Sequence, residues 1–244
     1  MTRTSLIFIA GMSVCFGNTV AAAPVEFQSA PVKTHLLELF TSEGCSSCPP
    51  AEVWLSGLKD AARLWRDFVP MAFHVDYWDN LGWRDPYAAR AWTARQYQYA
   101  SQWKSGSVYT PGFVLDGAEW SNRSALPKAT ETSGVLKINV ASAEDVTGSF
   151  APAKVANAPF ELHVARLGFG LTTDVKAGEN NGRKLRHDFV VLALDSAKML
   201  GDKTKIHLSA PSIPVRSDSR EAMVAWVTAV GAFEPIQAVG GWTR

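Results

Sequence analysis

The sequence predicts an α/β domain over residues 32–133, followed by a mostly β, sandwich-like domain over residues 134–244. Strand-like and helix-like apolar patterns alternate through the first segment, which is typical of an α/β fold. From residue 134 onward the apolar runs are short, little has helical period, and the connections are rich in Gly, Pro, Asn and Asp. The third observation is the motif Cys45-Ser46-Ser47-Cys48, which stands between a predicted strand and a predicted helix, where a redox motif belongs.

The first 23 residues have the order of a secretory signal peptide and are not expected to belong to the fold. Arg3 gives a positive start, residues 6–14 form an apolar run, and small residues follow at 21–23. We expect cleavage near residues 22 and 23 and a periplasmic or secreted protein. A membrane anchor is the alternative interpretation, but a span needs about 20 apolar residues. No later segment is apolar enough for membrane insertion after signal removal.

Removal of this leader leaves a chain without net charge. The full sequence carries 24 Lys and Arg against 23 Asp and Glu, and the leader takes Arg3 and Cys15 with it. A neutral chain gives no electrostatic reason to expect binding to nucleic acid or to an anionic membrane surface. Two cysteines, Cys45 and Cys48, remain in a compartment where disulfides persist.

The first segment alternates between predicted strands and helices. A buried strand is predicted at 32–40, and a helix begins at the CxxC motif, where Pro49 and Pro50 fit a first turn. The remaining predictions are a strand at 68–75, a helix at 85–103, an extended segment at 108–115, a hairpin turn at 116–117, a returning strand at 118–120 and a short helix at 124–132. In the second segment strands are predicted at 136–140, 160–167, 189–194, 205–208 and 222–229.

The spacing of Cys45 and Cys48 favours redox chemistry over a structural disulfide. A bond between such close residues closes almost no loop and adds little stability. The spacing also places both sulfurs on one side of the first turn of a helix, where backbone amides and the helix dipole favour negative charge. We therefore expect Cys45 to be an exposed nucleophilic thiolate and Cys48 the resolving thiol, with Ser46 and Ser47 as hydroxyl donors.

Zinc sites use the same cysteine spacing, so the motif has an alternative interpretation. A four-ligand structural zinc site needs two more ligands. After the leader the chain has no third cysteine, and its five histidines lack the H-x3-5-H spacing. The sequence therefore predicts no structural zinc at this motif, and the redox interpretation implies no metal and no organic cofactor.

A second motif, Tyr109-Thr110-Pro111-Gly112-Phe113, precedes an apolar strand and a DG turn. Together with the CxxC motif and the strand order between them, it resembles the cis-proline segment of the thioredoxin superfamily. The resemblance implies a thioredoxin-like, glutaredoxin-like core over residues 32–133. It further implies that Pro111 is cis and faces Cys45, and that the backbone of Thr110 pairs with an incoming peptide. A trans proline at a strand edge is the alternative.

The sequence departs from thioredoxin itself at two places. Gly44 stands where the common motif has tryptophan, and Ser46-Ser47 replaces Gly-Pro. Glu38, in the strand before the motif, has two interpretations. It is either a buried proton acceptor for Cys48 or a solvent-facing carboxylate at a strand edge, and the second is favoured because charged residues are rarely buried unpaired.

A more specific resemblance covers nearly the whole chain after the leader. The segment 37–50, the run His74-Val75-Asp76-Tyr77-Trp78-Asp79 and the segment 178–188 are similar to a family of exported bacterial proteins known as domain of unknown function 1223. That family has no settled reaction, so the resemblance implies the thioredoxin-like fold and little beyond it.

Two further clusters have a functional and a structural interpretation. His74, Tyr77 and Trp78 follow a predicted strand and either line a substrate groove or form an aromatic loop that packs on the long helix. His74 is more simply explained as a hydrogen-bonded residue than as a catalyst. Arg183 and His187, with Arg186, either reach the redox site from the second domain or belong to a solvent-exposed loop.

Three functions fit these residues. The first is thiol–disulfide exchange, an enzymatic activity in which Cys45 and Cys48 act on exported proteins or on a membrane redox partner through a mixed disulfide. The second is metal handling, with Cu(I) bound by Cys45, Cys48 and His74, since Cu(I) is a soft ion that suits thiolates. The third is a binding or scaffold module in which the cysteine pair has no catalytic role.

Overall fold

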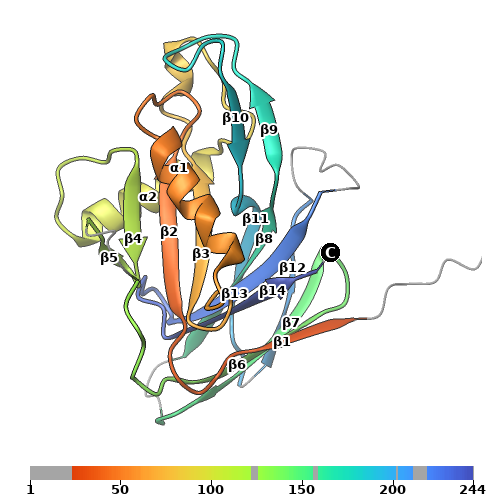
Figure 1. Cartoon of the computed structure of the whole chain (residues 1–244). Coiled ribbons are helices and arrows are strands. Elements are labelled where there is room, and N and C mark those ends of the chain that lie inside the picture. Colours follow the sequence, from red (N-terminus) through yellow and green to blue (C-terminus); the bar gives the residue numbers. More distant parts are fainter. Residues whose placement is uncertain (1–23, 122–125, 156–158, 202, 211–218, 244) are drawn as a thin grey trace, which may run out of the picture.

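Strands dominate the structure, and most of them belong to one mixed sheet. The computed structural model describes residues 24–121, 126–155, 159–201, 203–210 and 219–243 (Figure 1). The predicted signal peptide, residues 1–23, lies outside the described residues. Strands take up 44% of the described residues and helices 14%, so the fold is mostly β.

The described elements form three sheets and two α-helices. The eight-stranded sheet has the order β14-β13-β8-β11-β3-β2-β4-β5, a four-stranded sheet has the order β1-β6-β7-β12, and β9 and β10 form a hairpin. The strands are β1 (Val25–Gln28), β2 (His35–Thr41), β3 (Phe68–His74), β4 (Gly112–Leu115), β5 (Ala118–Glu119), β6 (Gly134–Val140), β7 (Asp145–Pro152), β8 (Phe160–Gly168), β9 (Leu171–Asp174), β10 (Lys184–His187), β11 (Val190–Lys198), β12 (Lys203–His207), β13 (Glu221–Ala229) and β14 (Gln237–Trp242). The helices are α1 (Pro49–Ser56) and α2 (Arg90–Gln102), with short 3-10 turns η1 (Gly57–Asp60) and η2 (Asp79–Leu81).

The predicted fold class is wrong. An α/β thioredoxin-like core would bring its own complete sheet, but here the strands of the first segment continue into the second. β3 pairs with β2 on one side and, in parallel, with β11 on the other, where Ala72 N donates to Phe189 O at 2.8 Å. Every residue of β3 is buried, so its apolar sequence predicts a central strand without saying which strand lies beside it.

Helices α1 and α2 cover opposite faces of this sheet beside the first-segment strands. Phe40 of β2 packs edge-on against Tyr99 of α2, and its neighbour Leu39 pairs in register with Phe113, which packs against Trp54 of α1. Successive side chains of a strand point to opposite faces, so β2, which is buried along its whole length, packs against both helices.

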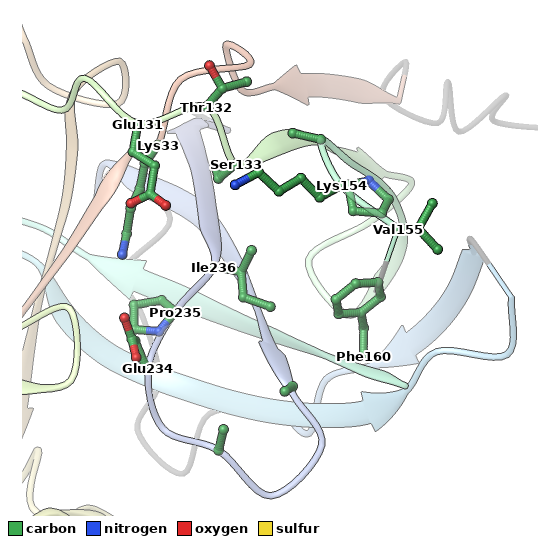
Figure 2. A pocket seen from close by; sticks show the side chains of 14 residues that line it. Lys33, Glu131, Thr132, Ser133, Lys154, Val155, Phe160, Glu234, Pro235 and Ile236 are labelled. Carbon is green, nitrogen blue, oxygen red and sulfur yellow. The ribbon is translucent and has the colours of Figure 1, made fainter. Parts of the chain in front are cut away.

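The four-stranded sheet packs on the far part of the large sheet. Leu136, Ile138 and Phe150 of β6 and β7 share one buried cluster with Leu162 of β8 and Val227 of β13. A pocket of about 420 Å³ lies beside this junction, with Glu131 and Glu234 on one side and Phe160 on the other (Figure 2). Lys33, just before β2, also lines the pocket, whereas Cys45 follows the other end of that strand.

Several predicted elements differ from the observed ones. Residues 126–132 form no helix, and residues 124 and 125 lie outside the described residues. Helix α2 begins at Arg90 and not at Asp85. The Asp85 carboxylate accepts from the amide of Tyr87 through Oδ1, but this forms a turn before the helix, and its Oδ2 is engaged by His74 and by the amide of Glu43. The sequence does not predict β7, an inner strand of the four-stranded sheet, or the short or edge strands β1, β9, β10 and β14. No helix of the described part of the chain is long and apolar enough to cross a membrane.

One buried side chain joins the start of β2 to both sheets. Gln237 of β14 is 0% exposed. Its Oε1 accepts from the Thr34 amide at 2.7 Å, and its Nε2 donates to the carbonyls of Val32 and Gly134 at 3.2 and 2.7 Å. The carbonyl of Ala30 is a third acceptor, at 3.0 Å.

We predict that Gln237→Ala lowers the free energy of unfolding by about 3 kcal/mol, because buried backbone groups lose their partners. Urea unfolding followed by circular dichroism measures this change. Gln98→Ala, on the exposed side of α2, is the matched control and should stay within about 0.5 kcal/mol of the parent. Equal stability of the two variants would contradict the role assigned to Gln237.

Candidate functional site

Cys45 and Cys48 are joined in a disulfide at the point where β2 gives way to α1. The predicted order of strand, CxxC motif and helix is therefore confirmed. The prediction that Cys45 is exposed is wrong, because Cys45 is 1% exposed and Cys48 0%. Ser46 and Ser47, between them, are exposed, so this turn meets solvent through its serines.

The peptide bond between Thr110 and Pro111 is cis, as the resemblance to cis-proline segments implied. The carbonyl oxygen of Thr110 lies 3.8 Å from the Sγ of Cys45. The two motifs are thus neighbours although they are 65 residues apart in the sequence. Ser47 Oγ lies 3.3 Å from the same sulfur and is placed to donate a hydrogen bond to it.

The start of helix α1 contributes less to this sulfur than expected. Pro49 and Pro50 have no amide hydrogen, and the next two amides, of Ala51 and Glu52, both donate to the carbonyl of Cys48 at 2.9 and 3.1 Å. These first-turn amides are therefore already engaged, and the Ser47 hydroxyl is the donor beside Cys45.

Trp78 covers the motif from the side of the cis bond. Its Nε1 donates to Thr110 Oγ1 at 2.8 Å. A Cβ at residue 44 would lie 2.8 Å from Trp78 Cβ, which explains why glycine stands at Gly44. Tyr77 is directed to Gln96, with its hydroxyl 3.3 Å from Oε1, and burial raises the pKa of Tyr77 to about 12, so it remains protonated.

A buried group of carboxylates and imidazoles lies behind the disulfide. His187 of β10 is held between two carboxylates, with Nε2 2.8 Å from Glu43 Oε1 and Nδ1 hydrogen-bonded to Glu52 Oε2. Glu43 comes just before Cys45, and Glu52 lies one turn into α1. Burial alone would lower the pKa of His187, but the hydrogen bonds and charges of Glu43 and Glu52 outweigh it and raise the pKa to about 10.

His74, at the end of β3, is the second buried imidazole. Its Nδ1 lies 2.7 Å from Asp85 Oδ2, and the same oxygen accepts from the Glu43 amide at 2.8 Å. Burial opposes charge on His74, yet Asp85 raises its pKa, and His74 in turn lowers the pKa of Asp85. His74 is therefore an ion-paired buried residue.

The loop between β9 and β10 reaches the CxxC motif from the second half of the chain. Asn180 Nδ2 donates to the carbonyls of Glu43 and Cys45 at 2.8 and 3.0 Å, and Arg183 holds Asn180 Oδ1 at 2.7 Å. Glu179 Oε2 accepts from the Ser46 amide at 2.9 Å. Figure 1 shows the β9–β10 hairpin beside the β2–α1 connection.

Of the sequence candidates in this region, His187 contacts the site directly and Arg183 acts through Asn180, whereas Arg186 is exposed on the alternate side of β10. The sequence reasoning missed Glu43, Glu52, Asp85, Glu179 and Asn180. The polar, turn-rich composition of residues 178–188 marked their neighbourhood, but nothing local paired them with residues 43–52.

Glu38 is neither solvent-facing nor a partner of the cysteines. It is 0% exposed, and Arg95 of α2 binds it through Nε and Nη2 at 2.6 and 3.0 Å. Tyr99 donates to the same carboxylate at 2.5 Å. The favoured interpretation, a solvent-facing carboxylate, is therefore wrong. None of these contacts joins Glu38 to Cys48, as the alternative role of proton acceptor requires. Glu38 is buried because a cation on α2 neutralises it.

The ligand set of the Cu(I) hypothesis does not converge. Among the described residues, the group of His, Cys, Asp and Glu with ligand atoms close enough for one ion is Glu52, His74 and His187. Neither Cys45 nor Cys48 belongs to it, and the Nδ1 atom of His74 is already held by Asp85.

We predict that Gly44→Ala destabilises the chain by about 1–3 kcal/mol, because its Cβ displaces Trp78. Loss of the bond from Trp78 to Thr110 should accompany this and change the tryptophan fluorescence. Gly57→Ala is the control, because a Cβ there meets nothing within 4 Å and its φ is −61°. Without strain, that change should stabilise the chain by about 0.4–1 kcal/mol. A stable Gly44→Ala variant with unchanged fluorescence would refute this packing.

Comparison with known proteins gives a family and a shared fold. Residues 36–228 match the family described as "Protein of unknown function (DUF1223)". A crystal structure of protein AGR_C_4864 from Agrobacterium tumefaciens matches with a TM-score of 0.57 and 24% identity, over 86% of this chain and 94% of that one. HBP35 of Porphyromonas gingivalis matches with a TM-score of 0.54 and 13% identity, over 87% and 76%.

No curated protein matches this chain. At these identities the two structures show the fold alone, and neither they nor the family match confirms the resemblance to the thioredoxin superfamily. The match over residues 36–228 does confirm the more specific resemblance. The chain belongs to the DUF1223 family of proteins of unknown function.

Proposed function

We propose that the chain catalyses thiol–disulfide exchange, with Cys45 as the nucleophile and Cys48 as the resolving thiol. The observation that carries this proposal is the position of the Cys45–Cys48 disulfide, whose first sulfur lies 3.8 Å from the carbonyl of Thr110, next to a cis proline. A peptide that pairs with the Thr110 backbone would be held beside this sulfur.

The structural alternative for the disulfide is weak on energetic grounds. The bond joins residues three apart in the sequence, so it removes little conformational entropy from the unfolded chain. The segment around it is already fixed by Asn180, Glu179 and Asp85, which bind its carbonyls and amides. A bond that adds little to such a segment is better explained by its chemistry.

The exchange needs no reactant other than the cysteine pair and the partner's disulfide or dithiol. In the reductive direction the Cys45 thiolate attacks a disulfide of the partner, forming a mixed disulfide and releasing one partner thiolate, which takes a proton. Cys48 then loses its proton and attacks Cys45, which releases the second partner thiol and restores the Cys45–Cys48 bond. Two electrons pass to the partner disulfide, and a partner dithiol returns them when the sequence runs in reverse.

Access to Cys45 requires a small opening, because the residue is 1% exposed. The contact from Glu179 to the Ser46 amide lies at the solvent-facing rim, and Trp78 lies over Gly44 and Thr110. A bound peptide that takes over the Ser46 amide in place of Glu179 would uncover the sulfur from this side. In this proposal Tyr77 and Trp78 border the bound peptide.

The proposed partners are proteins of the compartment to which a leader would direct the chain. We infer a leader over residues 1–23, a periplasmic or secreted chain, and exported proteins or a membrane redox partner as substrates through mixed disulfides. The proposed division places the exchange site in residues 32–133. Residues 134–244 supply the Asn180 and His187 contacts to it.

The decisive variants are Cys45→Ser and Cys48→Ser. We expect both to lose exchange with a model peptide disulfide. Only Cys48→Ser should accumulate a mixed disulfide, because Cys45 attacks and nothing resolves the product. Mass spectrometry after trapping and a fluorescent disulfide-reduction assay measure these outcomes. Parent-level exchange in Cys45→Ser, or no adduct with Cys48→Ser, would reject the assignment.

Glu179 offers a test of the rim contact. We predict that Glu179→Gln lowers the pKa of the reduced Cys45 thiol, because a nearby carboxylate disfavours the thiolate and glutamine keeps the acceptor for the Ser46 amide. The pH dependence of alkylation of reduced protein measures this pKa. Glu131→Gln, on the exposed surface near the distant pocket, should leave it unchanged. A rise in the Glu179→Gln variant would contradict the proposed arrangement.

A further inference from the structure

Three buried side chains from separate elements converge behind the CxxC motif. Glu52 comes from α1, His74 from β3 and His187 from β10, and one ligand atom from each lies within 4.8 Å of the other two. Their exposures are 6%, 1% and 1%. The two imidazole rings are nearly perpendicular, with centroids 5.0 Å apart.

One atom of this cluster has no partner among the described residues. His74 Nε2 is buried and makes no hydrogen bond, although His74 Nδ1 is fixed by Asp85. A buried polar atom without a partner is unfavourable, because it has lost its hydrogen bonds to water and gained none in the protein. Because Asp85 fixes the ring through Nδ1, the orientation of the Nε2 atom is fixed as well. This orphaned atom points to a ligand.

The hydrogen bonds around the two histidines resemble those around histidine ligands in metal sites. Each histidine has a carboxylate on its other nitrogen, Asp85 on His74 and Glu43 on His187. The hydroxyl of Thr41 donates to Glu52 Oε1 at 2.6 Å, so the carboxylate that faces His187 is also held. Histidine ligands commonly carry such a carboxylate on the nitrogen that does not bind the metal.

We propose that Glu52, His74 and His187 form a binding site for a divalent transition-metal ion, with Zn²⁺ as its occupant. Two imidazoles and one carboxylate suit this ion. His74 binds through Nε2, and the ion takes the place of the proton that His187 Nδ1 shares with Glu52 Oε2. At metal distances of about 2.0–2.1 Å the ligand atoms lie about 3.3 Å apart, so changes of up to about 1.5 Å in their separations complete the set.

The charge of the cluster is compatible with the same ion. Glu43, Glu52 and Asp85 place three carboxylates around two imidazoles in a region closed to solvent. A divalent cation bound to neutral imidazoles offsets two of the three negative charges, the same number that two protonated rings offset in the absence of metal. The cysteines are not ligands, and this site does not depend on the proposed exchange activity.

The sequence concealed this site because its ligands are far apart. His187 lies 135 residues after Glu52, and no two histidines have the spacing of a local zinc motif.

The test uses the full chain with Cys45→Ser and Cys48→Ser, so that no thiolate can bind metal. After chelator treatment, calorimetric titration with Zn²⁺ alone should show one ion per chain. Adding His74→Gln should weaken this binding by at least about tenfold, which a lost ligand produces. His163→Gln is the control, since His163 is a largely buried histidine stacked on Trp226 outside the cluster.

Co²⁺ binding gives a second readout that a folding defect does not imitate. The parent and the double serine variant should both give the absorption of nitrogen and oxygen ligands without a thiolate charge-transfer band. Should His74→Gln fail to fold, Glu52→Gln takes its place, because it keeps the size of the side chain. Absence of equimolar Zn²⁺ binding, or binding equal in the His74, Glu52 and His163 variants, would overturn the proposal. So would a thiolate band in the parent.

Discussion

The site depends on the hydrogen bonds that join the His187 imidazole to the carboxylates of Glu43 and Glu52. These carboxylates lie on either side of the cysteine pair, and both are buried. Charges in such surroundings are tolerated only when paired, and the imidazole that pairs them comes from the other half of the chain. The position of the CxxC turn is therefore fixed by a residue 144 positions after Glu43.

This constraint explains why the two halves share one sheet. β11 starts just after His187 and pairs with β3, while the β9–β10 loop sends Asn180 onto the carbonyls of Glu43 and Cys45. The β11–β3 pairing and the contacts of Asn180 thus both fix the second half of the chain against the CxxC segment. We infer that the second half of the chain completes the cysteine site, and that separating the halves would expose buried carboxylates without partners.

Local chemistry was readable from the sequence, and long-range pairing was not. The CxxC motif and Pro111 identified the disulfide and its cis neighbour because each is marked by its immediate sequence. The apolar run of β3 indicated a buried strand, but it does not encode that β11 lies beside it. Glu38 was misjudged because its cation, Arg95, comes from a helix 57 residues later, and burial of a carboxylate depends on such a partner.

The most direct test of a reactive cysteine pair is the reduction potential of Cys45–Cys48, measured on the full chain by equilibration with glutathione. Exchange proteins lie between about −270 and −120 mV, and a value in this range is the result our account predicts. Structural disulfides in secreted proteins lie below about −300 mV. A potential in that lower range would show that the bond serves the fold alone and would contradict the proposed exchange.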